Sequence, residues 1–312
     1  MPRPRHIARL AAAVTVLLAI GGCANATSGD DPVKLTVTRD FGARVLVEKT
    51  TKDVPGSETA MRLVQRNADV STRYGGGFVQ CVNDVCGGDG AGSREDWFYF
   101  VNGIEAPKGA AATRVRPGDH IWWDHRDWGA AERVPAVVGS FPEPFLHGPG
   151  EKRLPVRVEC LRPQDDVCRA AQQALVDFGI SASKTTLRSS IAQDTLRVVV
   201  GTWNLLREDG ALQGLEDGPS ASGVYAEPRA DGRSIALLDS RGRIARTLRA
   251  GGGLVAATRV GEEQPVWALT GTDAAGVAAA VEAFSERVLR NRYAVAVDAG
   301  GPVALPIAGG AG

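Results

Sequence analysis

A proline-rich stretch divides this chain of 312 residues. Residues 134–155 (VPAVVGSFPEPFLHGPGEKRLP) contain five prolines and show neither a helical nor a strand period. Proline lacks a backbone N–H and interrupts helices and central strands. At this length two domains are also more common than a single core. We therefore expect residues 129–154 to form a linker, packed on a surface, between a domain at residues 33–128 and another at residues 155–312.

The first domain has the pattern of strands around one helix. Residues 33–40 (VKLTVTRD) alternate apolar and polar side chains, and residues 43–50 (ARVLVEKT) complete a hairpin. Ser57 is the expected N-cap of a helix over residues 57–68 (SETAMRLVQRNA). Two further strands follow, an aromatic one over residues 97–101 that ends at an Asn-Gly turn and a last one within residues 120–128. The order strand, strand, helix, strand, strand predicts a small β-grasp-like domain.

The second domain reads as α/β. Residues 156–160 (VRVEC), 166–180 (DVCRAAQQALVDFGI) and 195–203 (TLRVVVGTW) predict a strand–helix–strand unit. More strands are expected over residues 252–259, 266–272 and 292–297, with one helix over residues 273–291 that is N-capped by Thr272 or Asp273. The predicted fold class is therefore α+β: a β-grasp-like ββαββ domain followed by a separate α/β domain.

The N-terminus has the pattern of an export signal. Three arginines precede the apolar run 10–20 (LAAAVTVLLAI), which is too short to span a bilayer but suits a secretory signal. Gly21 and Gly22 before Cys23 resemble a bacterial lipobox, in which the cysteine is diacylated. We expect a lipoprotein signal peptide at residues 1–22, lipidated (palmitate-bearing) Cys23 and a tether over residues 23–32. The alternative is an ordinary signal peptide with an incidental thiol; both place the protein outside the cytoplasm, and the lipid anchors it on the extracytoplasmic face of the cell membrane.

Four cysteines follow Cys23. In an oxidising compartment, two close local pairs favour the disulfides Cys81–Cys86 and Cys160–Cys168 over the two other connectivities. A four-thiolate zinc site is the rival, but the spacings lack a C-x-x-C knuckle, so no metal is expected.

Charge argues against nucleic acid as a partner. The chain has 36 basic and 36 acidic residues, and removal of residues 1–22 would leave 33 basic residues against 36 acidic ones. A mildly acidic protein lacks the basic surface that phosphate backbones require.

No catalytic constellation is visible. The exported chain has only His120, His125 and His147 as imidazole bases, and it lacks a G-x-S-x-G elbow and a P-loop. Ser181 and Lys184 form an S-x-x-K string without its usual partner motifs. Asp273 follows a strand where α/β domains place ligands, but a simple N-cap is the favoured interpretation.

Two acidic sets could hold a cation, but neither has the spacing of a metal loop. We expect both to be solvated: Asp124, His125 and Asp127 in one, and Glu208, Asp209, Glu216 and Asp217 in the other.

Aromatic residues cluster in the first domain, where four of the six tryptophans lie within 32 residues. Alternate positions of a strand face opposite ways, so one set can build the core while the other stays open to a ligand. The alternative is that the linker covers these rings. The expected ligand contacts are Trp97, Tyr99, Trp122, Trp123, His125 and Trp128.

The run 96–128 (DWFYFVNGIEAPKGAAATRVRPGDHIWWDHRDW), with VPGSETAMRLV upstream, resembles the C-terminal β-domain of transcobalamin and intrinsic factor, and bacterial surface lipoproteins built on that domain. The resemblance covers residues 33–128. It rests on the Trp97–Tyr99 strand, the Asn102–Gly103 turn, the loop 107–110, Gly118–Asp119 and the closing Trp128. In the vertebrate proteins this domain covers one face of cobalamin and a helical barrel holds the other. This chain has no such barrel, and its second domain resembles no family with a known function.

We therefore expect a non-enzymatic, lipid-anchored binding protein that captures cobalamin or a related cofactor and either passes it to a membrane transporter or combines with a separate helical-barrel protein. No cofactor is required. The alternative is a cell-envelope scaffold or adhesion module that docks a protein partner through its aromatic face. An enzyme with an active site near Asp273 ranks third.

Overall fold

The computed structural model describes residues 31–88, 92–150, 152–189 and 194–308, together with Met1. The predicted signal peptide and lipidated Cys23 therefore lie outside the described residues, as does most of the predicted tether. Among the residues that are described, no helix is long and apolar enough to cross a membrane. The protein is a mixed α/β structure with more strand than helix.

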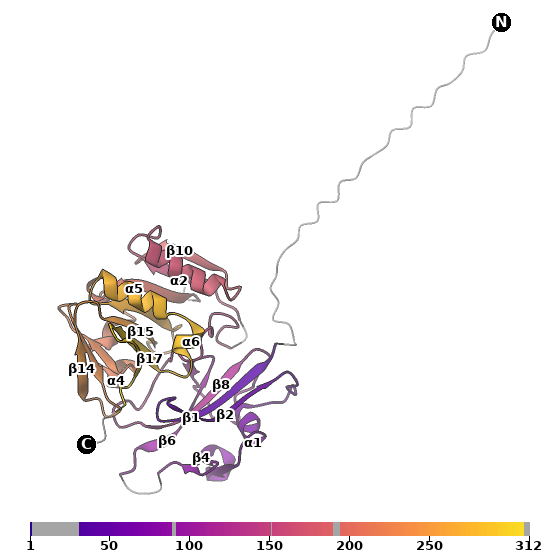
Figure 1. Ribbon diagram of the computed structural model, residues 1–312. Helices are drawn as coiled ribbons and strands as arrows, with labels where there is room; N and C mark the ends of the chain where they lie inside the picture. Colours follow the sequence, from indigo (N-terminus) through magenta and orange to yellow (C-terminus); the bar gives the residue numbers. More distant parts are fainter. Residues whose placement is uncertain (2–30, 89–91, 151, 190–193, 309–312) are drawn as a thin grey trace.

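The N-terminal part is built on a five-stranded sheet (Figure 1). Its strand order is β2 (Arg44–Thr51), β1 (Val33–Arg39), β8 (His120–Asp127), β6 (Glu95–Val101) and β7 (Ile104–Glu105). The central strands β1 and β8 are parallel, and the other neighbours are antiparallel. A small sheet joins β3 (Val70–Arg73), β4 (Phe78–Val82) and β5 (Val85–Cys86), with a 3₁₀ turn at Tyr74–Gly76.

The helix of this part, α1 (Ala60–Gln65), is shorter than the pattern predicted. Its N-cap is Thr59, whose hydroxyl accepts a 3.2 Å hydrogen bond from the Arg62 backbone N–H, so the expected cap at Ser57 is wrong by two residues. The predicted apolar stripe is buried: Ala60, Met61, Leu63 and Val64 pack on one face of the sheet.

The C-terminal part contains a seven-stranded sheet. The order is β10 (Ala182–Thr186), β9 (Val156–Cys160), β11 (Leu196–Thr202), β16 (Val266–Gly271), β15 (Gly253–Thr258), β17 (Ala294–Asp298) and β18 (Gly301–Leu305). The first four strands are parallel and the remaining pairs are antiparallel. The predicted strand–helix–strand unit is present as β9, α2 (Asp166–Val176) and β11, but β10 pairs at the far side of β9 and was not predicted.

One predicted helix is broken in two. The pattern over residues 273–291 becomes α5 (Ala274–Ala283) and α6 (Glu286–Leu289), with Phe284 in a non-helical conformation between them. The Phe284 ring is buried against Phe141 and Trp267, so tertiary packing decides where the helix ends. Asp273 is the N-cap of α5, in agreement with the prediction.

A further region had no sequence prediction. It holds a three-stranded sheet and several short turns of helix. These elements are β12 (Ala226–Pro228), β13 (Ile235–Leu238), β14 (Ile244–Leu248), α3 (Trp203–Leu206), α4 (Pro219–Ser222) and a 3₁₀ turn at Gln213–Leu215.

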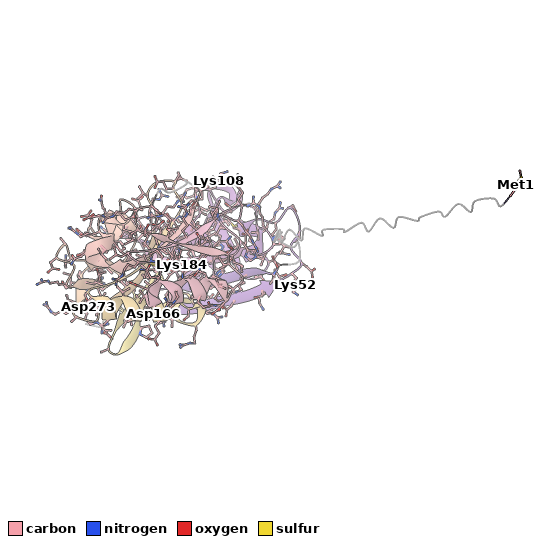
Figure 2. All side chains as sticks on the ribbon, turned by 90° about the horizontal axis from the view of Figure 1, so that it is seen from above. Met1, Lys52, Lys108, Asp166, Lys184 and Asp273 are labelled. Atoms are coloured by element: carbon pink, nitrogen blue, oxygen red, sulfur yellow. A yellow bond between two sulfur atoms is a disulfide. The ribbon has the colours of Figure 1, made fainter. Side chains whose placement is uncertain are left out.

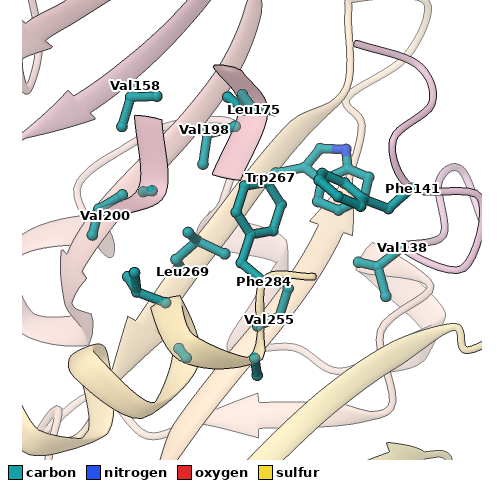
Figure 3. Close-up of a cluster of buried hydrophobic side chains, with 14 of the residues drawn as sticks. Val138, Phe141, Val158, Leu175, Val198, Val200, Val255, Trp267, Leu269 and Phe284 are labelled. Atoms are coloured by element: carbon teal, nitrogen blue, oxygen red, sulfur yellow. The ribbon is translucent and has the colours of Figure 1, made fainter. Parts of the chain in front are cut away.

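The proline-rich stretch is not a surface connector, and this correction changes the architecture. Val138, Phe141 and Phe145 are each at most 3% exposed, and they join the core of the C-terminal sheet. Figure 3 shows Phe141 lying beside Trp267 and Phe284. Proline prevents a regular helix or strand in this segment. Burial of its large apolar side chains is still favourable, and this burial places the segment in the core.

The two parts also share a core, so the C-terminal part does not pack as a separate domain. Phe41, Phe100 and Trp122 of the N-terminal part belong to the same buried cluster as Tyr225 and Tyr293. The Phe41 ring lies 5.0 Å from Tyr225 and 5.2 Å from Tyr293, in edge-on contacts. Edge-on packing of this kind is favourable between aromatic rings.

Both predicted disulfides are present. Cys81 pairs with Cys86 across the β4–β5 hairpin, and Cys160 pairs with Cys168, linking β9 to α2. Cys160 and Cys168 are buried, whereas Cys86 is exposed.

Candidate functional site

A groove of about 520 Å³ runs beside β6, the next-to-last strand of the N-terminal sheet. Strand β7 pairs only with Phe100 and Val101, so no named strand covers the earlier residues of β6 on that side. The groove lies between this strand, the small β4 sheet and the loop after β7. Its lining includes Met61, Phe78, Val79, Trp97, Phe98, Tyr99, Glu105, Ala106, Pro107, Ala110, Trp123, Glu132, Arg133 and Glu262.

Strand register brings three predicted ligand contacts together in this groove. Tyr99 is paired directly with Trp123, and residues opposite each other in an antiparallel ladder share a face. Their rings are stacked with centroids 4.7 Å apart. Trp97 is two residues away on the same face, and its Nε1 donates a 3.2 Å hydrogen bond to the Val85 carbonyl. The wall of the groove is therefore aromatic and fixed in place.

Hydrogen bonding around these rings is uneven. The Tyr99 hydroxyl donates to the Lys108 carbonyl and lies 2.8 Å from the Thr113 hydroxyl, and burial raises the pKa of Tyr99. Trp123 is only 3% exposed, and its Nε1 has no hydrogen-bond partner among the described residues. An unpaired buried N–H is costly, and this one is covered, so a ligand in the groove does not reach it as the side chains lie.

The rim of the groove is mostly acidic. Glu105, Glu132 and Glu262 line it together with one cation, Arg133. The Arg133 Nε lies 3.2 Å from Glu105 Oε2, so that pair is neutralised. Glu262 is paired with Arg259 Nη2 at 3.1 Å, so the groove combines apolar rings with the single negative charge of Glu132.

The other three predicted contacts lie elsewhere. Trp122 is on the opposite face of β8, has no exposed surface, and donates a 2.7 Å hydrogen bond from Nε1 to the Thr38 hydroxyl. His125 shares the face of Trp123, but its Nε2 lies 3.0 Å from the Cys86 carbonyl and it does not line the groove. Trp128 is half-buried beyond the end of β8. The six residues therefore do not form one surface, because Trp122 and Trp123 are adjacent and must face opposite ways.

Several lining residues were missed by sequence reasoning. Phe78 carries a weak signal, as an aromatic residue after three glycines, whereas Glu132 and Glu262 carry none. Glu262 comes from the loop after β15, more than a hundred residues from the strand that it faces, so only the tertiary structure brings it there.

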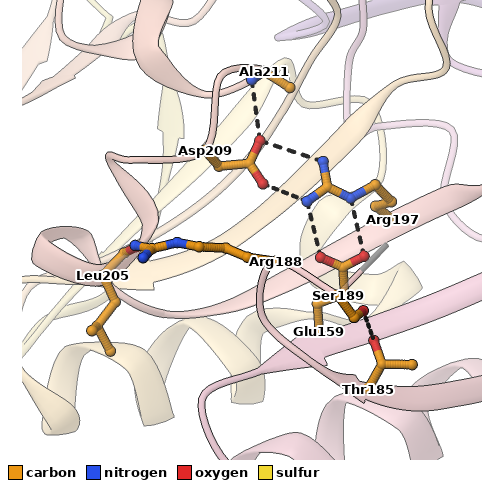
Figure 4. Close-up of polar contacts among 8 residues, drawn as sticks. All are labelled: Glu159, Thr185, Arg188, Ser189, Arg197, Leu205, Asp209 and Ala211. Carbon is orange, nitrogen blue, oxygen red and sulfur yellow. Dashed lines mark hydrogen bonds and ion pairs between the residues drawn. The ribbon is translucent and has the colours of Figure 1, made fainter. Parts of the chain in front are cut away.

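The expected solvated acids are partly buried instead. Asp124 has no exposed surface and accepts hydrogen bonds from Thr38, Gly42 and Tyr293. Burial raises its pKa to about 6. Asp209 lies against Arg197, which also holds the fully buried Glu159 (Figure 4). Within the described ranges, no group of three or more His, Cys, Asp or Glu side chains is arranged to hold a metal ion.

The histidines have structural partners. His120 is buried with its Nε2 2.9 Å from the Thr36 hydroxyl, and burial lowers its pKa to about 3. His147 lies between two acids, with Nδ1 2.5 Å from Glu143 Oε1 and Nε2 3.4 Å from Asp31 Oδ2; the hydrogen bond to Glu143 raises its pKa.

The Asp273 carboxylate, considered above as a possible enzymatic group, is already hydrogen-bonded to the backbone. Both carboxylate oxygens of Asp273 accept hydrogen bonds, Oδ1 from Gly276 N at 2.9 Å and Oδ2 from Gly251 N at 2.8 Å. These bonds lower the pKa of Asp273. Asp273 therefore has the geometry of a helix cap, and its second oxygen also holds the loop between β14 and β15 through Gly251.

Comparison with known proteins identifies one segment. A family model described as "Domain of unknown function (DUF4430)" matches residues 57–126, which include α1, the small sheet and most of the groove. No curated protein matches the chain. A crystal structure of a protein from Ruminococcus gnavus ATCC 29149, provisionally described as a metal binding protein, is similar over 31% of this chain and 97% of that chain. The sequence identity is 15% and the TM-score is 0.25.

Proposed function

We propose that this protein is a non-enzymatic, lipid-anchored binding protein of the extracytoplasmic membrane face, and that the groove along β6 holds a flat, cofactor-sized ligand. The observation that carries the proposal is the wall formed by Trp97, Tyr99 and Trp123 along the groove. The cavity volume falls within the range of small-molecule sites, which pair apolar walls with a few polar groups.

A corrinoid is the first ligand to test. The parallel pair β1 and β8 flanked by β2 and β6 is the strand order of a β-grasp-like domain, and the resemblance to the cobalamin-covering domain lies in the same segment. The aromatic edges that line the groove would contact the macrocycle. The protein would then pass its ligand to a membrane transporter, and nucleic acid is not an expected partner.

Thermal shift and tryptophan fluorescence of residues 24–312 provide the test. Ligand at 100 times its dissociation constant should add about 2.7 kcal/mol to the free energy of unfolding, a clear rise in Tm. Phe78→Ala removes an exposed ring from the groove, and Ile244→Ala removes an exposed apolar side chain from the distant strand β14. We expect a corrinoid to raise Tm in wild type and in Ile244→Ala but less in Phe78→Ala. Absence of any shift or quenching with cobalamin and its precursors would reject the corrinoid.

A protein-docking role is the second candidate, and one observation favours it. Tyr74 is 85% exposed, and its ring lies 6.2 Å from that of Phe78, so an aromatic pair projects beside the groove. Exposed aromatic residues are typical of interface anchors. This second candidate predicts no response to small molecules. It also predicts that a specific envelope protein is crosslinked to this surface and that Tyr74→Ala abolishes the crosslink.

A further inference from the structure

A second cavity adjoins the groove and has the opposite charge. It measures about 500 Å³ and shares the wall residues 105–107 with the groove. It forms where three segments meet, the region after β6, the proline-rich stretch at Pro149–Gly150 and the loop after β15. Its charged lining comprises Lys108, Arg114, Arg116, Arg259 and Glu105.

The one carboxylate of this cavity is already engaged. Glu105 Oε2 lies 3.2 Å from Arg133 Nε, and Glu105 Oε1 accepts a 3.4 Å hydrogen bond from the Val134 backbone N–H. Arg259 is itself paired with Glu262, so Lys108 and Arg114 contribute most of the excess positive charge at the cavity. Since the whole chain has equal numbers of basic and acidic residues, this concentration is local and does not follow from composition.

The cations differ in how firmly they are held. The side chain of Arg259 is 12% exposed, and it is fixed by Glu262 Oε2 at 3.1 Å and by the Glu263 carbonyl at 2.5 Å. Lys108 and Arg114 are exposed, and neither side chain has a hydrogen-bond or ion-pair partner among the described residues. Figure 2 shows Lys108 at the periphery of the molecule. One fixed cation and two unpaired ones suit an anion that arrives from solvent.

We propose that this cavity binds the phosphate group of a soluble small molecule. Guanidinium groups match phosphate oxygens through paired N–H donors, and a phosphate offers enough acceptors for several cations at once. The volume exceeds that of an inorganic phosphate, and Val101, Ile104 and Pro149 supply apolar surface for an organic body. The anion site stands on its own geometry. A further step, in which one ligand places its flat body in the groove and its phosphate in this cavity, rests on the proposed function.

The experiment is a ³¹P NMR titration of residues 24–312 with inorganic phosphate and pyrophosphate. Lys108→Ala/Arg114→Ala is the test variant, and Lys52→Ala/Arg249→Ala, which removes an exposed lysine and an exposed arginine elsewhere, is the matched control. We expect saturable line broadening with wild type and the control, and an affinity at least about tenfold weaker in the test variant, since each lost charge-assisted contact has an effect of that size. Phe78→Ala should bind phosphate normally, which separates this site from the groove.

Three outcomes would overturn the proposal. The first is no saturable broadening with wild type, and the second is equal affinity in wild type and the test variant. The third concerns the source of the phosphate. In this outcome the protein binds phosphatidylglycerol vesicles but not phosphatidylcholine vesicles, the binding depends on Lys108 and Arg114, and soluble phosphates give no response. That result would assign the cavity to a lipid headgroup.

Discussion

The Tyr293 hydroxyl donates a 2.9 Å hydrogen bond to Oδ2 of Asp124, and neither residue is more than 3% exposed. Asp124 belongs to β8 and Tyr293 precedes β17, so this bond joins the two parts of the molecule. The other oxygen, Oδ1, accepts a 2.5 Å hydrogen bond from the Thr38 hydroxyl, which in turn accepts from Trp122 Nε1. The Asp124 carboxyl group thus lies at the centre of the buried interface between the N-terminal and C-terminal parts. Its protonation state therefore affects the stability of that interface.

We expect the interface to weaken as pH rises. Burial raises the pKa of Asp124 from 3.8 to about 6, so between these values the folded protein keeps a proton that the unfolded chain releases. The contribution of Asp124 to stability therefore falls as pH rises through that window, by up to about 3 kcal/mol, while buried neutral His120 contributes with the opposite sign in wild type and in Asp124→Asn alike. Asp124→Asn should remove the Asp124 contribution. Urea unfolding from about pH 4 to pH 7 measures it, and parallel pH profiles for the two proteins would contradict the prediction.

Two tyrosines at this interface should respond differently to loss of the hydroxyl. Tyr293→Phe removes the donor to Asp124 and should cost about 1–2 kcal/mol of unfolding free energy. The Tyr225 hydroxyl is buried without a partner among the described residues, so Tyr225→Phe should be neutral or stabilising. Both rings contact Phe41, which makes the pair a matched control. Denaturant midpoints compare them, and equal losses would show that the hydrogen bond to Asp124 is not the cause.

Gly42 tests the contact between the first hairpin and the chain before β17. It has a φ of 81°, and a Cβ there would lie 2.0 Å from the Asn291 carbonyl oxygen. Gly251 has a φ of 77° with no atom within 4 Å of its Cβ position. Gly251→Ala should therefore show only the backbone cost of about 1–2 kcal/mol, while Gly42→Ala should lose about 2 kcal/mol more. Thermal melts of the two variants separate the backbone cost of a positive φ from the steric clash with Asn291. Equal Tm values would show that the clash at Gly42 has no effect on stability.

Arg197 should be far more important for stability than a surface arginine. It lies between Glu159, which has no exposed surface, and Asp209 (Figure 4). Arg197→Met leaves a buried carboxylate unpaired and should cost about 3–5 kcal/mol. Arg188→Met breaks an exposed pair with Glu208 and should cost at most about 1 kcal/mol. Urea unfolding of both variants gives the comparison, and a small loss in Arg197→Met would mean that Glu159 takes up a proton instead.

Local patterns predicted a good part of the fold. Alternation in residues 33–40, the apolar stripe of α1, and the segments of β9, α2, β11, β15 and β16 each satisfy a short-range rule of periodicity or capping. The disulfides followed from close spacing, because the second cysteine of each pair is only five or eight residues from the first. Alternation also predicted that neighbouring aromatic residues of β8 would face opposite ways.

The candidate site was only half predictable. Trp97, Tyr99 and Trp123 were expected as ligand contacts, and strand register brings them to one groove. Trp122 was expected there too, but it is adjacent to Trp123 on β8 and lies on the opposite face, which the C-terminal part covers. No local pattern reveals which face of a sheet a distant segment will cover.

The sequence by itself determined the crosslinks and many of the strands and helices, because those depend on neighbours a few positions away. Tertiary structure decided that the proline-rich stretch enters a core, that α5 stops at Phe284, and that Glu262 and Arg259 reach the N-terminal part. Burial and charge placement depend on which surfaces meet, and that is settled by packing between segments far apart in the chain.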